Sequence, residues 1–146
     1  MMQGNLLTFL ILWNVTSILN IPLYSQSIEN KILDEKLIGI WKGIESNQQI
    51  QGMEKLWEMT RYPDGTYSIK FKIDFRGYIS ESLEKGEWWI ENGKYHEKHH
   101  ISQDTDIYDY KILDGNKIRF ELLESPNDFN NQNYQFVDTL IEAPYL

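Results

Sequence analysis

The sequence lacks cysteine entirely, which excludes disulfide bonds, cysteine metal centres and a lipid anchor on a thiol. Basic residues are also scarce, with 14 Lys and Arg against 22 Asp and Glu and a formal net charge of −8. Such a chain repels nucleic acids and anionic membrane surfaces, so we expect neither as a partner. The 146 residues, 41% of them hydrophobic, suffice for one folded domain with its own core.

Signals of catalysis are scarce too. The sequence has no Gly-x-Ser-x-Gly motif and no phosphate-binding glycine loop. Scattered acids such as Glu45, Glu58, Glu81 and Glu87 would form an acid–base pair only if the fold brought two of them together, and chance proximity is expected among 22 acids. We therefore expect a protein that is not an enzyme and that needs no cofactor.

The N-terminal segment carries no Asp, Glu, Lys or Arg before Glu29. Leu6 to Trp13 is apolar apart from one threonine, and a more polar stretch ending at Ser25 follows. This layout is typical of a secretory signal peptide, with residues 1–25 removed and residues 26–146 forming the mature domain. An uncleaved anchor over Leu6 to Tyr24 and an ordinary buried segment are the alternatives, and two Asn and a Pro argue against the anchor. We expect export to the periplasm or the extracellular space, without stable membrane insertion after cleavage.

The rest of the chain has the pattern of a β-meander. Residues alternate between apolar and polar from Thr66 to Phe75, and turn pairs such as Asn92-Gly93 and Asp114-Gly115 separate short runs. The helical spacing of apolar residues between Ile28 and Leu37 predicts a short helix before them. We expect an all-β, antiparallel up-and-down barrel of 8–9 strands. The strands are predicted near 38–46, 54–62, 66–75, 78–84, 87–91, 94–101, 107–113, 116–124 and 132–139.

Three stretches of the sequence together resemble a known family. They are Gly39-Ile40-Trp41, the segment from Arg61 to Tyr67, and Gly86-Glu87-Trp88-Trp89 followed by Asn92-Gly93. In this order they resemble the calycin superfamily, in particular exported bacterial lipocalin-like proteins, over Ile32 to Ile141. The resemblance implies that Gly39 and Trp41 form the barrel floor and that a late-strand arginine, Arg119, lies over the Trp41 ring. The alternation of Arg119 with its neighbours Ile118 and Phe120 instead favours the outer face.

A ligand site inside such a barrel would be lined by side chains with inward parity. The candidate ligand-binding residues are Trp57, Met59, Arg61, Tyr67, Phe71, Trp88, Tyr108, Tyr110 and Phe120. The alternative is that they simply fill the core. An inward Arg61 needs a carboxylate such as Asp64 or Glu87, or an anionic ligand head group.

The run from His96 to His100 is a weak metal candidate, because on a strand His96 and His100 are four residues apart and His99 faces the other way. We expect a solvated face there and no metal.

The main hypothesis is a carrier of a small apolar or amphipathic molecule. The alternatives are a filled barrel acting in protein contacts or envelope structure, and a haem or metal barrel. The sequence carries no signal for an oligomeric state.

Overall fold

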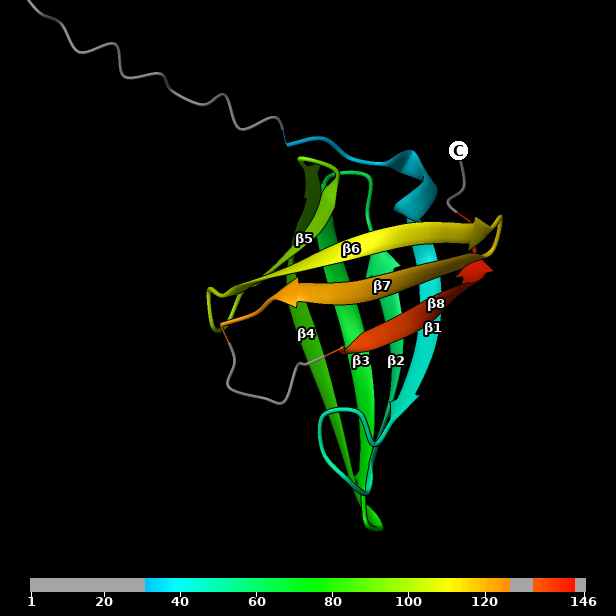
Figure 1. Cartoon of the computed structure of the whole chain (residues 1–146), viewed down its shortest axis with the longest axis vertical. Helices are drawn as coiled ribbons and strands as arrows, with labels where there is room; N and C mark the ends of the chain where they lie inside the picture. Colours follow the sequence, from blue (N-terminus) through cyan, green and yellow to red (C-terminus); the bar gives the residue numbers. More distant parts are fainter. Residues whose placement is uncertain (1–30, 127–132, 144–146) are drawn as a thin grey trace, which may run out of the picture.

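The computed structural model describes residues 31–126 and 133–143, so the expected signal peptide, residues 1–25, lies outside the described residues. Eight antiparallel strands, each paired with the next and β8 paired with β1, form a closed barrel (Figure 1). The all-β up-and-down prediction is confirmed. The strands are β1 (Gly39–Ser46), β2 (Met53–Arg61), β3 (Thr66–Phe75), β4 (Tyr78–Glu91), β5 (Lys94–His99), β6 (Thr105–Asp114), β7 (Lys117–Glu124) and β8 (Gln135–Glu142).

At two of the connections, the turns lie where the sequence predicts them. At the β2–β3 turn, Asp64 accepts hydrogen bonds from the backbone and the hydroxyl of Thr66, and Gly65 takes a φ of +84°. At the β4–β5 turn, Asn92 and Gly93 both have positive φ, as a type I′ turn requires. These turns fix the register in which Trp57 faces Phe71, and the register decides which side chains enter the barrel.

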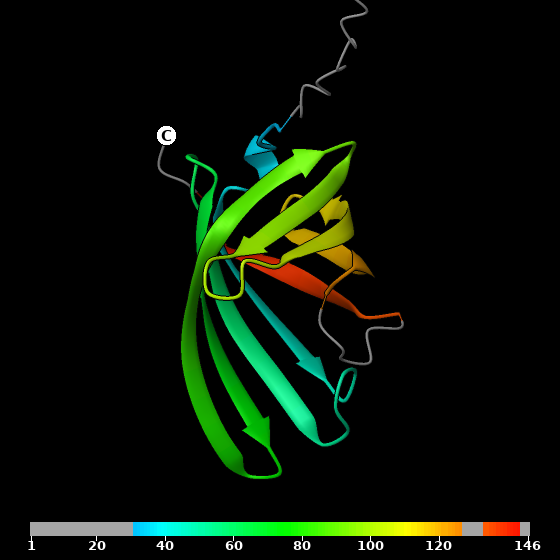
Figure 2. The same ribbon diagram turned by 90° about the vertical axis from the view of Figure 1, so that its left-hand side faces the viewer.

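Strand β4 differs from the prediction, because residues 78–91 form one continuous strand rather than two. Its first part pairs with β3 and its last part with β5 (Figure 2). Gly86 lies where these pairings meet, and a Cβ there would stand 2.0 Å from the Lys98 carbonyl oxygen and 2.5 Å from the Tyr67 ring. The glycine therefore permits a close approach and does not reverse the chain. The barrel has eight strands for this reason.

The expected helix before the first strand is reduced to a 3-10 turn, η1 (Glu35–Leu37), within the described residues. Ile32 instead forms an isolated antiparallel bridge with Ile90. Leu37 is fully buried, and its carbonyl oxygen accepts a hydrogen bond of 2.9 Å from Trp41 Nε1. The turn thus closes one end of the barrel against Trp41.

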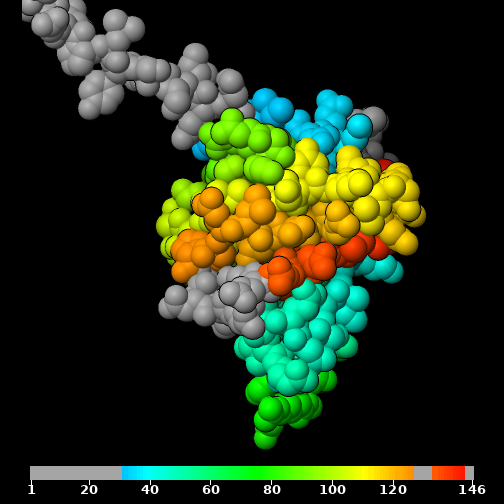
Figure 3. Space-filling view, in the orientation of Figure 1, coloured from blue at the N-terminus to red at the C-terminus, as the bar shows by residue number. Residues whose placement is uncertain are grey.

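The β3–β4 hairpin projects beyond the body of the barrel (Figures 1 and 3). Its tip exposes Tyr78 and Ile79, and Leu83 is exposed further along β4. In the described part of the chain, no helix has both the length and the hydrophobicity that a transmembrane span requires.

Candidate functional site

The closed end of the barrel contains Trp41, which is buried as the floor prediction required, and Gly39 at the start of β1. Arg119 does not cover this tryptophan. It lies on the outer face of β7 and is exposed, whereas its neighbours Ile118 and Phe120 are fully buried. The prediction of an Arg119 lid is therefore wrong, because strand alternation directs this side chain to solvent.

The barrel interior holds a buried ion pair in the middle of its aromatic core. Arg61, 1% exposed, places Nη2 2.8 Å from Oδ2 of Asp138 on β8. Asp138 also accepts a hydrogen bond from Trp57 Nε1 at 2.8 Å. The Arg61 guanidinium lies over the rings of Tyr95 and Phe120, at 5.1 and 4.9 Å from their centroids. Inward Arg61 is confirmed, but its acidic partner is Asp138.

The acids predicted to neutralise Arg61 lie elsewhere. Asp64 is occupied at the β2–β3 turn, and Glu87 is exposed on the outer face of β4. Asp138 was missed because it is 77 residues away in the sequence, so that only closure of the barrel brings it to Arg61. The alternation of Phe136, Asp138 and Leu140 on β8 was the available signal for its inward direction.

A cavity of about 190 Å³ lies inside the barrel. Its apolar wall consists of Trp57, Met59, Ile69, Phe71, Tyr108 and Phe136. Its polar wall consists of Gln49, Lys55, Glu84, Glu97, His99, Asp106 and Tyr134. A larger hollow of about 490 Å³ lies on the outer side of β2–β4, between side chains such as Lys70 and Lys85, and does not enter the barrel.

Four of the nine predicted ligand-binding residues line the cavity, namely Trp57, Met59, Phe71 and Tyr108. The other five lie around it or below it. Arg61, Trp88 and Phe120 are fully buried in the core, Tyr67 is buried with its hydroxyl at Glu84, and Tyr110 donates a hydrogen bond to Asp34 near η1. The aromatic residues thus fill one part of the barrel and leave the other part hollow.

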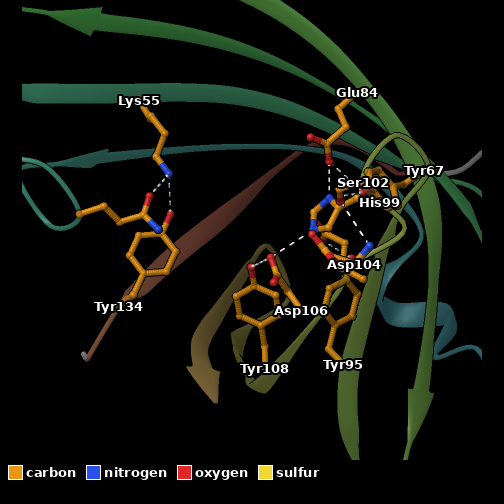
Figure 4. Close-up of polar contacts among 12 residues, drawn as sticks. Lys55, Tyr67, Glu84, Tyr95, His99, Ser102, Asp104, Asp106, Tyr108 and Tyr134 are labelled. Carbon is orange, nitrogen blue, oxygen red and sulfur yellow. Dashed lines mark hydrogen bonds and ion pairs between the residues drawn. The ribbon is translucent and has the colours of Figure 1, made fainter. Parts of the chain in front are cut away.

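The polar wall centres on His99, which bridges two carboxylates (Figure 4). Its Nδ1 lies 2.5 Å from Glu84 Oε1, and its Nε2 lies 3.1 Å from Asp106 Oδ2. Tyr67 donates a further hydrogen bond of 3.0 Å to Glu84, and Tyr108 donates one of 3.4 Å to Asp106. The hydrogen bonds to Asp106 and Glu84 raise the pKa of His99 to about 10, against the effect of burial. The imidazole is therefore a cation at neutral pH, with both nitrogens donating.

Glu97 lies next to this bridge and is only 8% exposed. Its Oε2 accepts a hydrogen bond of 2.9 Å from the Tyr95 hydroxyl, which itself accepts one of 3.1 Å from Arg61 Nε. Burial raises the pKa of Glu97 to about 7, although Arg61 and His99 act in the opposite direction. Within the described residues Glu97 forms no ion pair. Glu97 is therefore a buried acid whose pKa lies close to neutral pH.

Lys55 forms a separate cluster on the other side of the cavity. Its ammonium group lies 3.3 Å from Glu45 Oε1 and donates hydrogen bonds to Gln49 Oε1 at 2.6 Å and to the Tyr134 hydroxyl at 3.2 Å. Burial lowers the pKa of Lys55, and the carboxylate of Glu45 acts in the opposite direction. The positive charge of Lys55 is thus matched by a protein acid.

The histidine run behaves differently from the expected solvated face. His96 stacks on Trp89, and exposed His100 follows the strand, but Glu97 and His99 point into the barrel. The prediction is wrong for these two residues. The run matches the sequence motif His-Glu-x-x-His, which binds zinc when both histidines lie on one face of a helix. Here His96 lies on strand β5 and His100 lies in the turn after it, so the motif does not form a helix. Among residues 31–126 and 133–143, the group that could hold a metal ion is Glu84, Glu97 and His99, whose donor atoms lie within 4.8 Å of one another.

Neither protein-family models nor curated protein sequences match this chain. The likeness to lipocalin-like proteins therefore rests on architecture, a closed eight-stranded antiparallel barrel with a buried tryptophan near its closed end. Chemically, the interior offers a small cavity with an aromatic wall facing a charged one. This arrangement suits the non-covalent capture of a molecule that is itself part apolar and part polar.

Proposed function

We propose that this protein is an exported lipocalin-like carrier that binds a small amphipathic molecule inside the barrel and does not transform it chemically. The observation that carries the proposal is the cavity of about 190 Å³ with one apolar and one charged wall. A core designed for stability alone would have no reason to keep charged groups and empty space together, because both reduce stability. Export is supported by the apolar, uncharged N-terminal segment.

The size of the cavity limits the ligand. Pockets for drug-sized molecules have volumes of about 300–1,000 Å³, so a cavity of about 190 Å³ accepts a smaller compound, such as one with a single ring and a short polar chain. Long fatty acids and haem are too large for it. The proposal therefore favours a compact amphipathic metabolite over a lipid.

Titration with a small environment-sensitive apolar dye tests the proposal. We expect saturable 1:1 binding, together with a retained small molecule in native mass spectrometry of protein from its source. Ile69→Phe narrows the cavity and should abolish dye binding, whereas the matched change Ile79→Phe on the exposed hairpin should not. Near-UV circular dichroism checks that both variants stay folded. Absence of saturable binding to the wild-type protein would refute the proposal.

A second candidate function is a protein-contact module, and the β3–β4 hairpin favours it. The hairpin tip exposes Tyr78 at 81% and Ile79 at 61%, next to Phe75. Exposed apolar clusters of this kind often mark interaction surfaces. If this surface carries the function, Tyr78→Ser with Ile79→Ser should abolish partner binding and leave dye binding unchanged.

A further inference from the structure

We infer that the ligand carries a cationic ammonium group, which binds beside the carboxylate of Glu97, and a small apolar body, which packs on the aromatic wall of the cavity. The inference rests on the proposed function, because it assigns a chemical class to the molecule held in the same cavity.

The first argument is the balance of charge on the cavity wall. The cationic side chains that line the cavity are Lys55 and His99. Lys55 is matched by Glu45, and His99 is shared between Glu84 and Asp106 through its two ring nitrogens. The acids of the polar wall thus exceed the available cations, so the cavity is an environment of negative potential.

The second argument is that Glu97 is buried without a cation of its own. Its contact with Arg61 passes through the Tyr95 hydroxyl, and the Arg61 guanidinium is already paired with Asp138 at 2.8 Å. A buried carboxylate is costly unless a positive charge and hydrogen bonds compensate it. An ammonium group brings both, since it carries one charge and donates several hydrogen bonds.

The third argument concerns the opposite wall, which is built for an apolar body. The ring of Trp57 contacts that of Phe136 edge-on at 5.1 Å, and Tyr108 contacts Phe136 at 5.7 Å. Aromatic faces attract a nearby organic cation as well as apolar groups. The same geometry excludes an anionic head group held by Arg61, because Arg61 does not line the cavity.

A divalent metal ion is the competing occupant, since donor atoms of Glu84, Glu97 and His99 lie within 4.8 Å of one another. A metal would have to displace the proton on His99 Nδ1 that bonds to Glu84. A metal ion held by these three residues would also make no use of the aromatic wall on the other side of the cavity. An organic ammonium requires no such displacement and uses both walls, so the observations favour it.

Isothermal titration calorimetry at pH 7.5 with three molecules of similar size tests the inference. The probes are 2-phenylethylamine, neutral 2-phenylethanol and anionic 3-phenylpropionate. We expect the amine to bind at least about tenfold more tightly than the alcohol, the contribution of one charge-assisted hydrogen bond, and the anion to bind most weakly.

Two variants assign the preference to one carboxylate. Glu97→Gln should weaken amine binding about tenfold and leave alcohol binding within about twofold, because the amide keeps the size of the side chain but not its charge. Glu87→Gln is the matched control, since Glu87 is exposed on the outer face of β4, and it should change neither affinity. Equal losses for amine and alcohol in Glu97→Gln would overturn the inference.

The outcomes separate this inference from the proposed function. If the dye and the alcohol bind but the amine has no advantage, the inference fails and the carrier function survives. If neither the dye nor any of the three probes binds, the proposed function fails. Stoichiometric zinc binding that is lost in His99→Gln but kept in His100→Gln, without any preference for the amine, would identify a metal site and overturn the inference.

Discussion

The pH dependence of stability offers a direct test of the buried acid in the barrel. Burial raises the pKa of Glu97 from 4.5 to about 7. The folded state therefore holds this proton more tightly than the unfolded state, and the resulting stabilisation is complete below pH 4.5 and is lost as the pH rises through about 7. A shift of this size corresponds to about 3 kcal/mol in the free energy of unfolding, most of it between pH 5 and pH 8.

Other groups near Glu97 titrate too, so the effect must be isolated. His99, with its pKa raised from 6.5 to about 10, adds stability that is full below pH 6.5 and lost towards pH 10. The remaining charged or hydrogen-bonding neighbours are Arg61, Asp106 and Tyr95. Burial acts to raise the pKa of Asp106, but its hydrogen bonds and the charge of His99 together lower it. Comparing the wild-type protein with Glu97→Gln cancels the contributions that do not depend on Glu97, while the part of the raised pKa of His99 that the Glu97 charge causes is removed together with Glu97. The glutamine carbonyl can still accept the hydrogen bond from Tyr95.

The measurement is urea unfolding followed by tryptophan fluorescence at pH 5, 6, 7 and 8, with the ligand-free protein. We expect Glu97→Gln to gain stability over the wild type by about 2–3 kcal/mol as the pH rises from 5 to 8. Glu87→Gln, on the exposed face of β4, should show a difference that does not vary with pH. If the difference in the free energy of unfolding between the wild type and Glu97→Gln does not vary with pH, the pKa of Glu97 is not raised in the folded protein.

Two further changes test the core by urea unfolding. Arg61→Met leaves the carboxylate of Asp138 buried without a cation and should cost about 3–5 kcal/mol, part of which Arg61→Met with Asp138→Asn should restore; a cost under about 1 kcal/mol would contradict a tight pair. Gly43→Ala places a Cβ 2.1 Å from the ring of Trp57 and should cost about 1–3 kcal/mol, whereas Gly115→Ala, with no atom within 4 Å, should stay within about 0.5 kcal/mol. Equal effects of the two glycine substitutions would show that the core tolerates this contact.

The fold was predictable because local signals agree with each other. The alternation over Thr66–Phe75 gives one buried face, and turn pairs such as Asn92-Gly93 adopt the positive φ angles that they favour. Gly86 misled the prediction, because a glycine that permits close contact looks like a glycine that ends a strand. Only the neighbouring strands distinguish these two roles, and a single strand's sequence does not contain them.

The candidate site was only partly predictable, and the missed residues share a cause. Glu97 and His99 follow the same alternation as Tyr95 on β5, which was enough to place them inside. Their polarity instead suggested a solvated face, the usual position of such residues. Lys55, Glu84 and Asp106 were missed for the same reason. Which of them pair with each other depends on barrel closure, which sets contacts between strands far apart in sequence.

The buried polar network leads from the filled core to Glu97 on the wall of the cavity. The single hydroxyl proton of Tyr95 is directed to Glu97 Oε2, because the Tyr95 oxygen already accepts a hydrogen bond from Arg61 Nε. Arg61 is held in turn by Asp138, and Asp138 by Trp57. The chain of hydrogen bonds thus runs from the filled core to the wall of the cavity, although Arg61 Nη1 is buried without a hydrogen-bond partner in the described part of the protein. It ends on Glu97, which forms no ion pair with a described side chain and whose pKa burial raises to about 7, so a cation bound in the cavity would favour the ionised form of this acid.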